Sequence, residues 1–232
     1  MATAESDDRQ RLDRWLSLIR GPALIGPADA VFARRTQAIA EMHAAGAERL
    51  FPLLRPMLSD PDPPVRFAAC EAAFFVDARR ALELVLPLLA DPESEIRWFV
   101  SGCLHYSKDE RAIVPLVRVL QEDSSAQVRG AAAYALGRIG SPAAIPALLA
   151  AMESDHEPDM HGHSASSGAA TALDDILGTN ETRIRLPSGD YTLRRGEPDL
   201  DLLRRVGVER FQQWSSSREP GVAADGGRDP DS

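Results

Sequence analysis

One pattern occurs three times along the chain and constrains the fold more than any other feature. Each copy is an apolar residue followed by arginine, with an acidic residue five positions before it and a run of small and apolar residues after it. Successive copies are 31 and 32 residues apart. The apolar-arginine pairs are Val65-Arg66, Ile96-Arg97 and Val128-Arg129, and the acidic residues are Asp60, Asp91 and Asp123. A fixed period of this length predicts an array of similar structural units.

Each unit is predicted to be a pair of helices. In the stretch 128–140, VRGAAAYALGRIG, apolar residues recur at steps of three and four, which is the spacing of one helix face. Asp62 and Ser125 are suitable N-caps for the second helices, and Pro63 suits a first helical turn. Prolines recur inside the first helices, where we expect them to bend the helix. These prolines are Pro87, Pro115 and Pro146. The predicted turns between units are Gly46, Asp77, Lys108 and Gly140.

The motif Asp-Pro-x-x-x-Val-Arg, followed by an alanine-rich helix at this period, resembles HEAT repeats, and most closely the bacterial PBS-lyase HEAT-like type. The resemblance covers roughly residues 34–178. It implies an all-α fold, an α-α superhelix of about four to five helix pairs that stack into one continuous core. It also implies a convex layer of first helices and a concave layer of second helices. The same family includes scaffolds, bilin lyase subunits, regulators and a di-iron hydroxylase.

The two ends of the chain depart from the repeat, so we divide it into four parts. Residues 1–33 are predicted to form a capping helix with Leu12, Trp15, Leu16 and Ile19 on one face, and residues 34–178 to form the array. Within the array, residues 156–164 are expected to be an inserted loop before the last helix. Residues 179–214 are predicted to form a short β-hairpin and a capping helix. Residues 215–232 are rich in Gly, Pro and Asp, which predicts disorder.

Composition disfavours several classes of partner and location. The net charge is -9, so an acidic surface would repel nucleic acids and anionic membranes. The N-terminus lacks the features of a signal peptide, and no apolar run reaches about 18 residues. The two cysteines, Cys70 and Cys103, show no metal-ligand spacing. We therefore expect a cytoplasmic monomer without a cofactor.

The arginines of the motif allow two interpretations. Arg66, Arg97 and Arg129 could form a row of anion-binding guanidiniums on the concave side. Alternatively, each could pair with an acidic residue of an adjacent turn, such as Asp60, Asp91 or Asp123, and lock successive units together. The second interpretation is favoured.

The outward face of the second helices supplies the candidate binding residues. If the apolar anchors face the core, the positions two, six and nine residues after them face the concave groove. Aromatic side chains on such a surface suit a protein or peptide partner, while an acidic residue among them would select a basic one. The alternative is that Phe67 and Trp98 pack between units as extra core. The candidate partner-binding residues are Phe67, Glu71, Phe74, Trp98, His105 and Tyr134.

Catalytic and metal chemistry have little support in the sequence. No GxSxG, P-loop or GxGxxG motif is present, and Cys103 and His105 are two residues apart on one helix, so they point to different faces. The stretch DHEPDMHGH, 155–163, gathers His156, His161 and His163 with acidic residues, but its spacing matches no known ligand pattern. We expect a solvated loop there, with no metal site and no catalytic residue.

Three functions remain open. The favoured one is a non-catalytic scaffold that binds a protein or peptide on its concave face. The second, implied by the family resemblance, is a bilin lyase or isomerase whose groove would be lined by His105, Tyr106 and Tyr134. The third is an immunity or antitoxin-like protein that neutralises a basic partner.

Overall fold

The structure, a computed structural model, describes residues 2–20, 28–158, 164–179, 183–185, 191–193 and 199–218. Ten α-helices are described in these ranges, together with four 3-10 helices and two short strands. The N-terminal part contains α1 (Ala2–Arg20), α2 (Ala28–Ala45), α3 (Ala47–Met57), α4 (Pro63–Val85), η1 (Leu86–Ala90), α5 (Ser94–Cys103) and η2 (Leu104–Ser107). The C-terminal part contains η3 (Glu110–Ala112), α6 (Ile113–Glu122), α7 (Ala126–Ile139), η4 (Pro142–Ala144), α8 (Ile145–Ser154), α9 (Ala165–Leu177), β1 (Arg183–Arg185), β2 (Tyr191–Leu193) and α10 (Leu200–Ser216).

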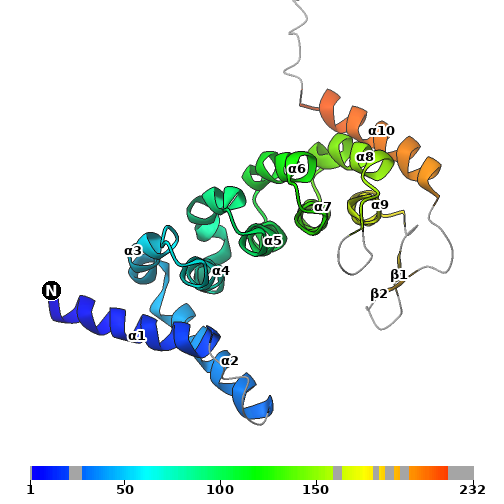
Figure 1. Cartoon of the computed structure of the whole chain (residues 1–232). Helices are drawn as coiled ribbons and strands as arrows, with labels where there is room; N and C mark the ends of the chain where they lie inside the picture. The colour runs from blue at the N-terminus through cyan, green and yellow to red at the C-terminus, as the bar shows by residue number, and fades with distance from the viewer. Residues whose placement is uncertain are drawn as a thin grey trace, which may run out of the picture.

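The helices stack as the repeat predicts. Figure 1 shows two rows that follow a common curve, with α4, α5, α7 and α9 side by side in the inner row. The first helices of the units, including α3, α6 and α8, form the outer row. The second helices therefore line the concave side, and the fold is an all-α solenoid.

The four predicted turns all break the helical backbone. Asp77 has an extended conformation (φ -165°, ψ 97°), which divides α4 into the second helix of one unit and the first helix of the next. Gly46 and Gly140 have φ values of 83° and 78°, a region that glycine enters without a steric penalty. Lys108 also has a positive φ, 51°. Its Nζ donates to the carbonyl oxygen of Arg138 at 2.8 Å, so this turn is tied to the next unit.

The prolines of the first helices lie in 3-10 turns or in first helical turns, whereas the sequence predicted them in helix interiors. Pro87 lies in η1, where the helix tightens into a 3-10 turn. Pro115 and Pro146 lie in the first turns of α6 and α8, which follow the 3-10 turns η3 and η4. A first turn has no intrahelical partner for its N–H groups, so these two prolines remove no helical hydrogen bond. Pro115 and Pro146 therefore do not interrupt the hydrogen bonding within α6 and α8.

One apolar core runs along the array. Ile96 and Val128 are buried in it, whereas Val65 is only half-buried. Small residues let neighbouring helices approach closely: a Cβ built on Gly137 of α7 would lie 2.6 Å from Cα of Ala172 in α9. The glycine at this position is therefore needed for the contact between these two helices.

The N-terminal end of the array is formed by α1 and α2. Leu12, Trp15 and Leu16 of α1 are buried, as predicted. The indole Nε1 of Trp15 donates to Glu41 of α2 at 2.7 Å. Because α2 begins at Ala28, it crosses the predicted domain boundary between residues 33 and 34.

The C-terminal end contains the predicted last helix, α10, whereas residues 159–163 of the predicted inserted loop lie outside the described residues. Ser164 caps α9 through a reciprocal pair of hydrogen bonds with Ser167, so the helix restarts where the sequence predicted. β1 and β2 pair antiparallel, with Ile184 opposite Thr192. Residues 186–190, which would complete the predicted hairpin, lie outside the described residues. Helix α10 packs against α8, and residues 219–232 lie outside the described residues.

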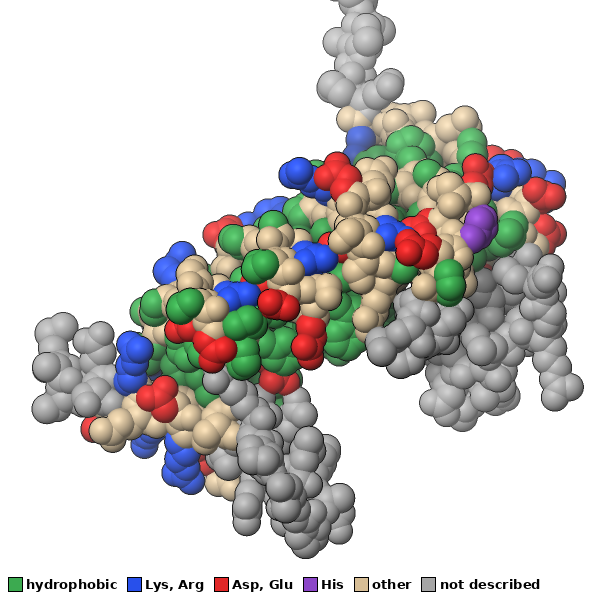
Figure 2. Space-filling view, viewed as in Figure 1, with side chains coloured by type: hydrophobic (Ala, Val, Ile, Leu, Met, Phe, Trp, Pro, Cys, Tyr) green, Lys and Arg blue, Asp and Glu red, His purple; other side chains and the backbone are tan. Residues whose placement is uncertain are grey.

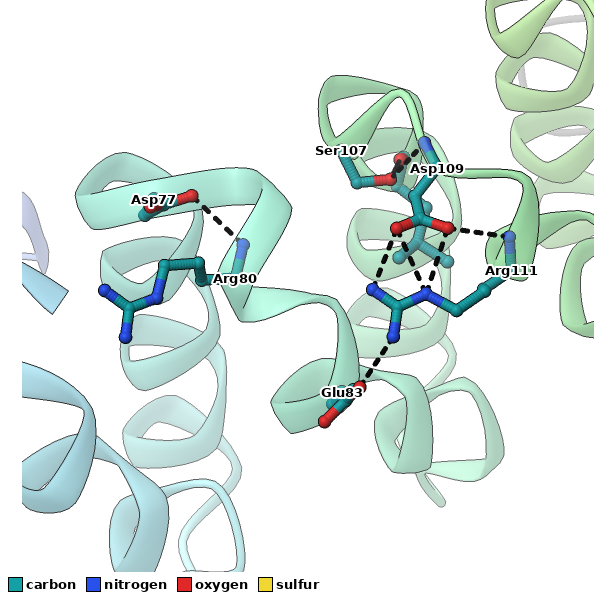
Figure 3. A network of polar contacts seen from close by, with 7 residues as sticks. Asp77, Arg80, Glu83, Ser107, Asp109 and Arg111 are labelled. Carbon is teal, nitrogen blue, oxygen red and sulfur yellow. Dashed lines mark hydrogen bonds and ion pairs between the residues drawn. The ribbon is translucent and has the colours of Figure 1, made fainter. Parts of the chain in front are cut away.

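A polar network fixes the turns between units. The Asp109 carboxylate accepts from the backbone N–H of Arg111 at 2.9 Å and from its guanidinium, while the same guanidinium reaches Glu83 of the preceding unit at 2.6 Å (Figure 3). The carboxylate of Asp77 accepts from the backbone N–H of Arg80 in the corresponding turn, also drawn in Figure 3. In these two turns an aspartate thus caps the first helix of the next unit. None of the described helices is long and apolar enough to cross a membrane.

Candidate functional site: the concave trough

The arginines of the repeated motif pair with the following unit. The guanidinium of Arg66 makes two hydrogen bonds to the carboxylate of Asp91, both at 2.7 Å. Arg97 meets Asp123 in the same way at 2.7 and 3.1 Å, and Arg129 meets Asp155. In Figure 2, blue and red side chains alternate along the array on the face turned to the viewer. The interpretation of these arginines as interunit locks is confirmed.

Each guanidinium also bonds to its own unit. Nη1 of Arg66 donates to the carbonyl oxygen of Asp60 at 2.9 Å, and Nη1 of Arg97 donates to that of Asp91 at 2.8 Å. The carboxylate of Asp91 in turn accepts from the backbone N–H of Glu93 at the start of α5. This carboxylate, and the equivalent one of Asp123, caps the second helix from two residues before the N-cap. Asp62 and Ser125 occupy the predicted N-cap positions of α4 and α7, but their own side chains make no capping hydrogen bond.

The pairs Arg66–Asp91, Arg97–Asp123 and Arg129–Asp155 form a ladder along the array. This ladder is a structural element and has few hydrogen-bonding groups left for a ligand. Burial raises the pKa of Asp91, but the hydrogen bonds from Arg66 and from the backbone of Glu93 outweigh it, so the pKa is lower than usual. The hydrogen bond to Asp91 raises the pKa of the Arg66 guanidinium. Both groups therefore stay charged and paired. A cavity of about 720 Å³ lies beside the ladder, between η1 and α6 on the outer side. It is bordered by Asp91, Arg97 and Asp123, which already bind one another.

The strongest candidate for a binding site is a cavity of about 770 Å³ on the concave side, bordered by α5, α7 and α9. We call it the concave trough. A cavity of this size, lined mainly by apolar groups, is in the range of ligand and peptide sites. Its lining residues are Trp98, Phe99, Gly102, Cys103, Gln127, Gly130, Ala131, Tyr134, Ser164, Ser167, Gly168, Thr171, Ala172 and Asp175.

The trough arises from a difference in side-chain size between neighbouring helices. Helix α7 contributes Gly130 and Ala131 to the floor, and a Cβ built on Gly130 would meet nothing within 4 Å. Trp98 on α5 and Tyr134 on α7 are the large side chains at its edge, with 40% and 47% of their surface exposed. Two large aromatic side chains thus border a floor that lacks side-chain volume.

The structure separates the predicted binding residues into two groups. Trp98 and Tyr134 line the trough. Phe67 and Phe74 instead pack against the ring of Phe99, with centroids 4.7 and 6.1 Å away, and Phe74 is buried. They belong to the core between α4 and α5. The outward orientation predicted for Phe74 was therefore wrong.

Glu71 and His105 are also buried, contrary to the prediction that they face the groove. The Nδ1 atom of His105 lies 2.7 Å from the carbonyl oxygen of Gly102. Burial lowers the pKa of His105, which favours the neutral imidazole. The centroid of its ring lies 4.0 Å from that of Tyr106, in a tilted contact, and 5.3 Å from that of Tyr134, in an edge-to-face contact. His105 therefore supports Tyr134 from beneath.

Sequence reasoning missed the floor of the trough. Gly102 and Gly130 occupy outward positions in the repeat, six and two residues after their anchors, and the predicted binding residues do not include them. Gly168 is the equivalent of Gly130 in the following unit, and a Cβ on it would lie 3.5 Å from Cβ of Ala133. Glycines at outward positions of successive units were the available signal.

Neither a reactive thiol nor a metal site is found among the described residues of the trough. Cys103 borders the trough, and burial, followed by the nearby Glu71 carboxylate, raises the pKa of its thiol to about 11. In the part of the chain that the structure describes, no three His, Cys, Asp or Glu side chains are placed to hold a metal ion. Asp159, His161 and His163 of the inserted loop lie outside that part.

Stacked helix pairs with a repeated Arg–Asp lock define the class of the protein, an α-solenoid of short repeats. Comparison with protein families agrees: the model of HEAT repeats matches residues 27–99 and 82–169, more than half of the chain. The chain belongs to the HEAT-repeat family. A comparison with curated proteins finds no match.

Proposed function

We propose that the chain is a non-catalytic interaction module, a scaffold that binds a segment of a protein or peptide partner in the concave trough. The observation that carries this proposal is the pairing of Trp98 and Tyr134, both well exposed, with the empty space above Gly130. Exposing large aromatic groups to water is unfavourable, and such groups commonly form the centre of an interface. A segment that covered both rings and filled the space above Gly130 would bury them.

The charge of the trough favours a basic partner. Among the described residues that line it, Asp175 is the one charged side chain, and no lysine or arginine is present. The chain as a whole carries a net charge of -9, which would attract a basic segment at long range. A cytoplasmic location and a monomeric state remain part of this proposal.

The substitution Gly130→Leu tests the proposal because it fills the trough while its Cβ meets nothing within 4 Å. A displayed library of random peptides is panned on the wild-type chain, with counter-selection on the folded Gly130→Leu variant. We expect peptides that bind the wild-type chain at least about tenfold more tightly than the variant. Equal capture by both proteins, at equal helicity, would rule out the trough as the binding site.

A bilin-handling role, as in PBS-lyase-type HEAT proteins, is the second candidate. The specific observation in its favour is the cluster of His105, Tyr106 and Tyr134 beside the trough, whose rings contact one another and which the sequence suggested for this role. The exposed aromatic rings of Tyr106 and Tyr134 could contact the conjugated rings of a tetrapyrrole. The test is titration of the chain with a bilin. A shifted absorbance band that Tyr134→Ala abolishes would favour this function over peptide binding.

A further inference from the structure

The concave trough follows the direction of the helices that form it. On α9 its lining residues recur at steps of three and four, from Ser164 through Ser167 and Thr171 to Asp175. Residues at this spacing form one stripe along a helix. A stripe of this length extends about 16 Å at 1.5 Å per residue. An occupant can therefore lie along α7 in contact with this whole stripe, with α5 and α9 on either side.

The width of the trough suits another helix. Helices in contact lie about 8–10 Å apart, so α5 and α9, which flank α7, lie roughly 16–20 Å apart. A helix with its side chains is about 10–12 Å in diameter. Gly130 and Ala131 on the floor place no long side chain between α7 and such a helix. The backbone of the occupant can thus approach α7 closely.

The hydroxyl groups on the α9 wall offer few free donors to an extended occupant. An extended segment brings unpaired backbone N–H and C=O groups, which are costly to bury without partners. The hydroxyl of Ser167 already donates to the carbonyl of Ser164 at 2.8 Å, and that of Thr171 donates to the carbonyl of Ser167 at 3.0 Å. A helix satisfies its own backbone groups and needs little from these walls.

The ends of the trough differ in charge. Glu95 is exposed on α5 one turn before Trp98, and Glu93 precedes it at the start of the helix. The opposite end has charges of both signs, with Asp175 on α9 and Arg138 one turn beyond Tyr134 on α7. A basic group on the occupant is therefore best placed beside Glu95.

We infer that the occupant of the trough is an amphipathic α-helix of a partner protein, with its apolar stripe on Gly130 and Trp98 and a basic end beside Glu95. This inference rests on the proposed function, whose partner it specifies. The mode of recognition is a helix in a groove, read through side chains at i, i+3, i+4 and i+7.

The test uses two synthetic peptides of about 16 residues with identical composition. One has leucines at i, i+3, i+4 and i+7 and three lysines at one end, and the other has the same leucines in strict alternation. Binding of each labelled peptide to the full chain is followed by fluorescence anisotropy. We expect the helical peptide to bind at least about tenfold more tightly, with the preference lost in Gly130→Leu and weakened in Glu95→Lys.

The possible results separate this inference from the proposed function. If both peptides bind equally well and Gly130→Leu weakens both, the trough binds a segment but does not select a helix. If neither peptide binds, or if Gly130→Leu leaves binding unchanged, the inference is also overturned. In that case the panned library decides independently whether the trough binds any peptide. Circular dichroism of each variant confirms that the array is folded in every comparison.

Discussion

The guanidinium of Arg66 and the carboxylate of Asp91 form a two-bond ion pair across the boundary between two units, with both N–O distances at 2.7 Å. Each side chain is buried, with 9% and 2% of its surface exposed. Fork-like pairs of this geometry are among the strongest side-chain contacts, and removing one partner leaves the other charge buried.

Asp91→Ala is therefore expected to lower the free energy of unfolding by about 2–3 kcal/mol. The loss is limited because Arg66 keeps its bonds to the backbone of Asp60 and Pro61. Urea unfolding followed by circular dichroism measures it. Glu122→Ala, which breaks the exposed pair with Arg118, is the matched control and should leave the midpoint unchanged. A similar loss in both variants would contradict the locking role of the ladder.

Stability is expected to fall in acid partly through Asp109. Hydrogen bonds from the side chain and then the backbone of Arg111 lower the pKa of Asp109 from 3.8 to about 2. A carboxyl whose pKa is lower in the folded state stabilises the fold above its unfolded pKa, and this contribution is lost as the pH falls toward the folded value. The contribution of Asp109 is thus complete above about pH 4 and disappears toward pH 2. Urea midpoints measured across this range should decline less steeply in Asp109→Asn than in the wild-type chain.

Two glycines of α7 should respond in opposite directions to the same substitution. Gly137→Ala places a Cβ 2.6 Å from Cα of Ala172, a backbone atom that cannot rotate away. We expect a loss of about 1–3 kcal/mol in the free energy of unfolding. Gly130→Ala meets nothing within 4 Å and should gain about 0.5–1 kcal/mol from helix propensity. Thermal unfolding of the two variants checks this pair, and equal effects would argue against the close contact between α7 and α9.

Trp98→Ala should separate binding from stability. Removing this exposed ring is expected to weaken a library-selected peptide by about 2 kcal/mol, while the midpoint of unfolding stays within error of the wild type. Trp15→Ala is the opposite case, because Trp15 is buried and bonded to Glu41. It should destabilise the array and leave the affinity of the folded fraction unchanged. Isothermal titration together with urea unfolding distinguishes the two outcomes.

Cys103 should react slowly at neutral pH. With the thiol pKa raised to about 11 from 9.0, the reactive thiolate is about 100-fold less abundant than for an ordinary cysteine. Burial also raises the pKa of Cys70, which should stay unlabelled until the chain unfolds. Mass spectrometry after timed exposure to a disulfide reagent measures both rates. The rate at Cys103 should rise with pH and fall when a peptide occupies the trough, and fast labelling of Cys70 in the folded chain would contradict this assignment.

The periodicity of the sequence was sufficient to predict the solenoid. The Val-Arg motif predicted the second helices, and the turn positions from Gly46 to Gly140 were placed correctly because they keep the register of the repeat. The restart of the helix near Ser164 was also predictable, because the sequence of α7 from Gly130 to Gly140 is echoed from Gly168 to Gly178. These features depend on residues close together in the chain.

The candidate site was less predictable because it depends on packing between helices. Phe74 and Trp98 occupy predicted outward positions in successive units, nine and two residues after their anchors, yet Phe74 is buried against Phe99 of the next unit while Trp98 stays exposed. His105 was predicted to face the groove, but its ring turns inward to the carbonyl of Gly102. The trough itself comes from the missing side chain of Gly130, and a pattern of aromatic residues does not show an empty space.

The Arg–Asp lock joins successive units at three junctions with the same two kinds of side chain, Arg66 to Asp91, Arg97 to Asp123 and Arg129 to Asp155. The arginine of one unit could therefore pair with the aspartate of any other unit of this type. Deleting one whole unit between two such joints would bring Arg66 opposite Asp123, and duplicating a unit would create another complete pair. Such an array can gain or lose units while the contact between units stays the same. The length of its concave surface changes with the number of units.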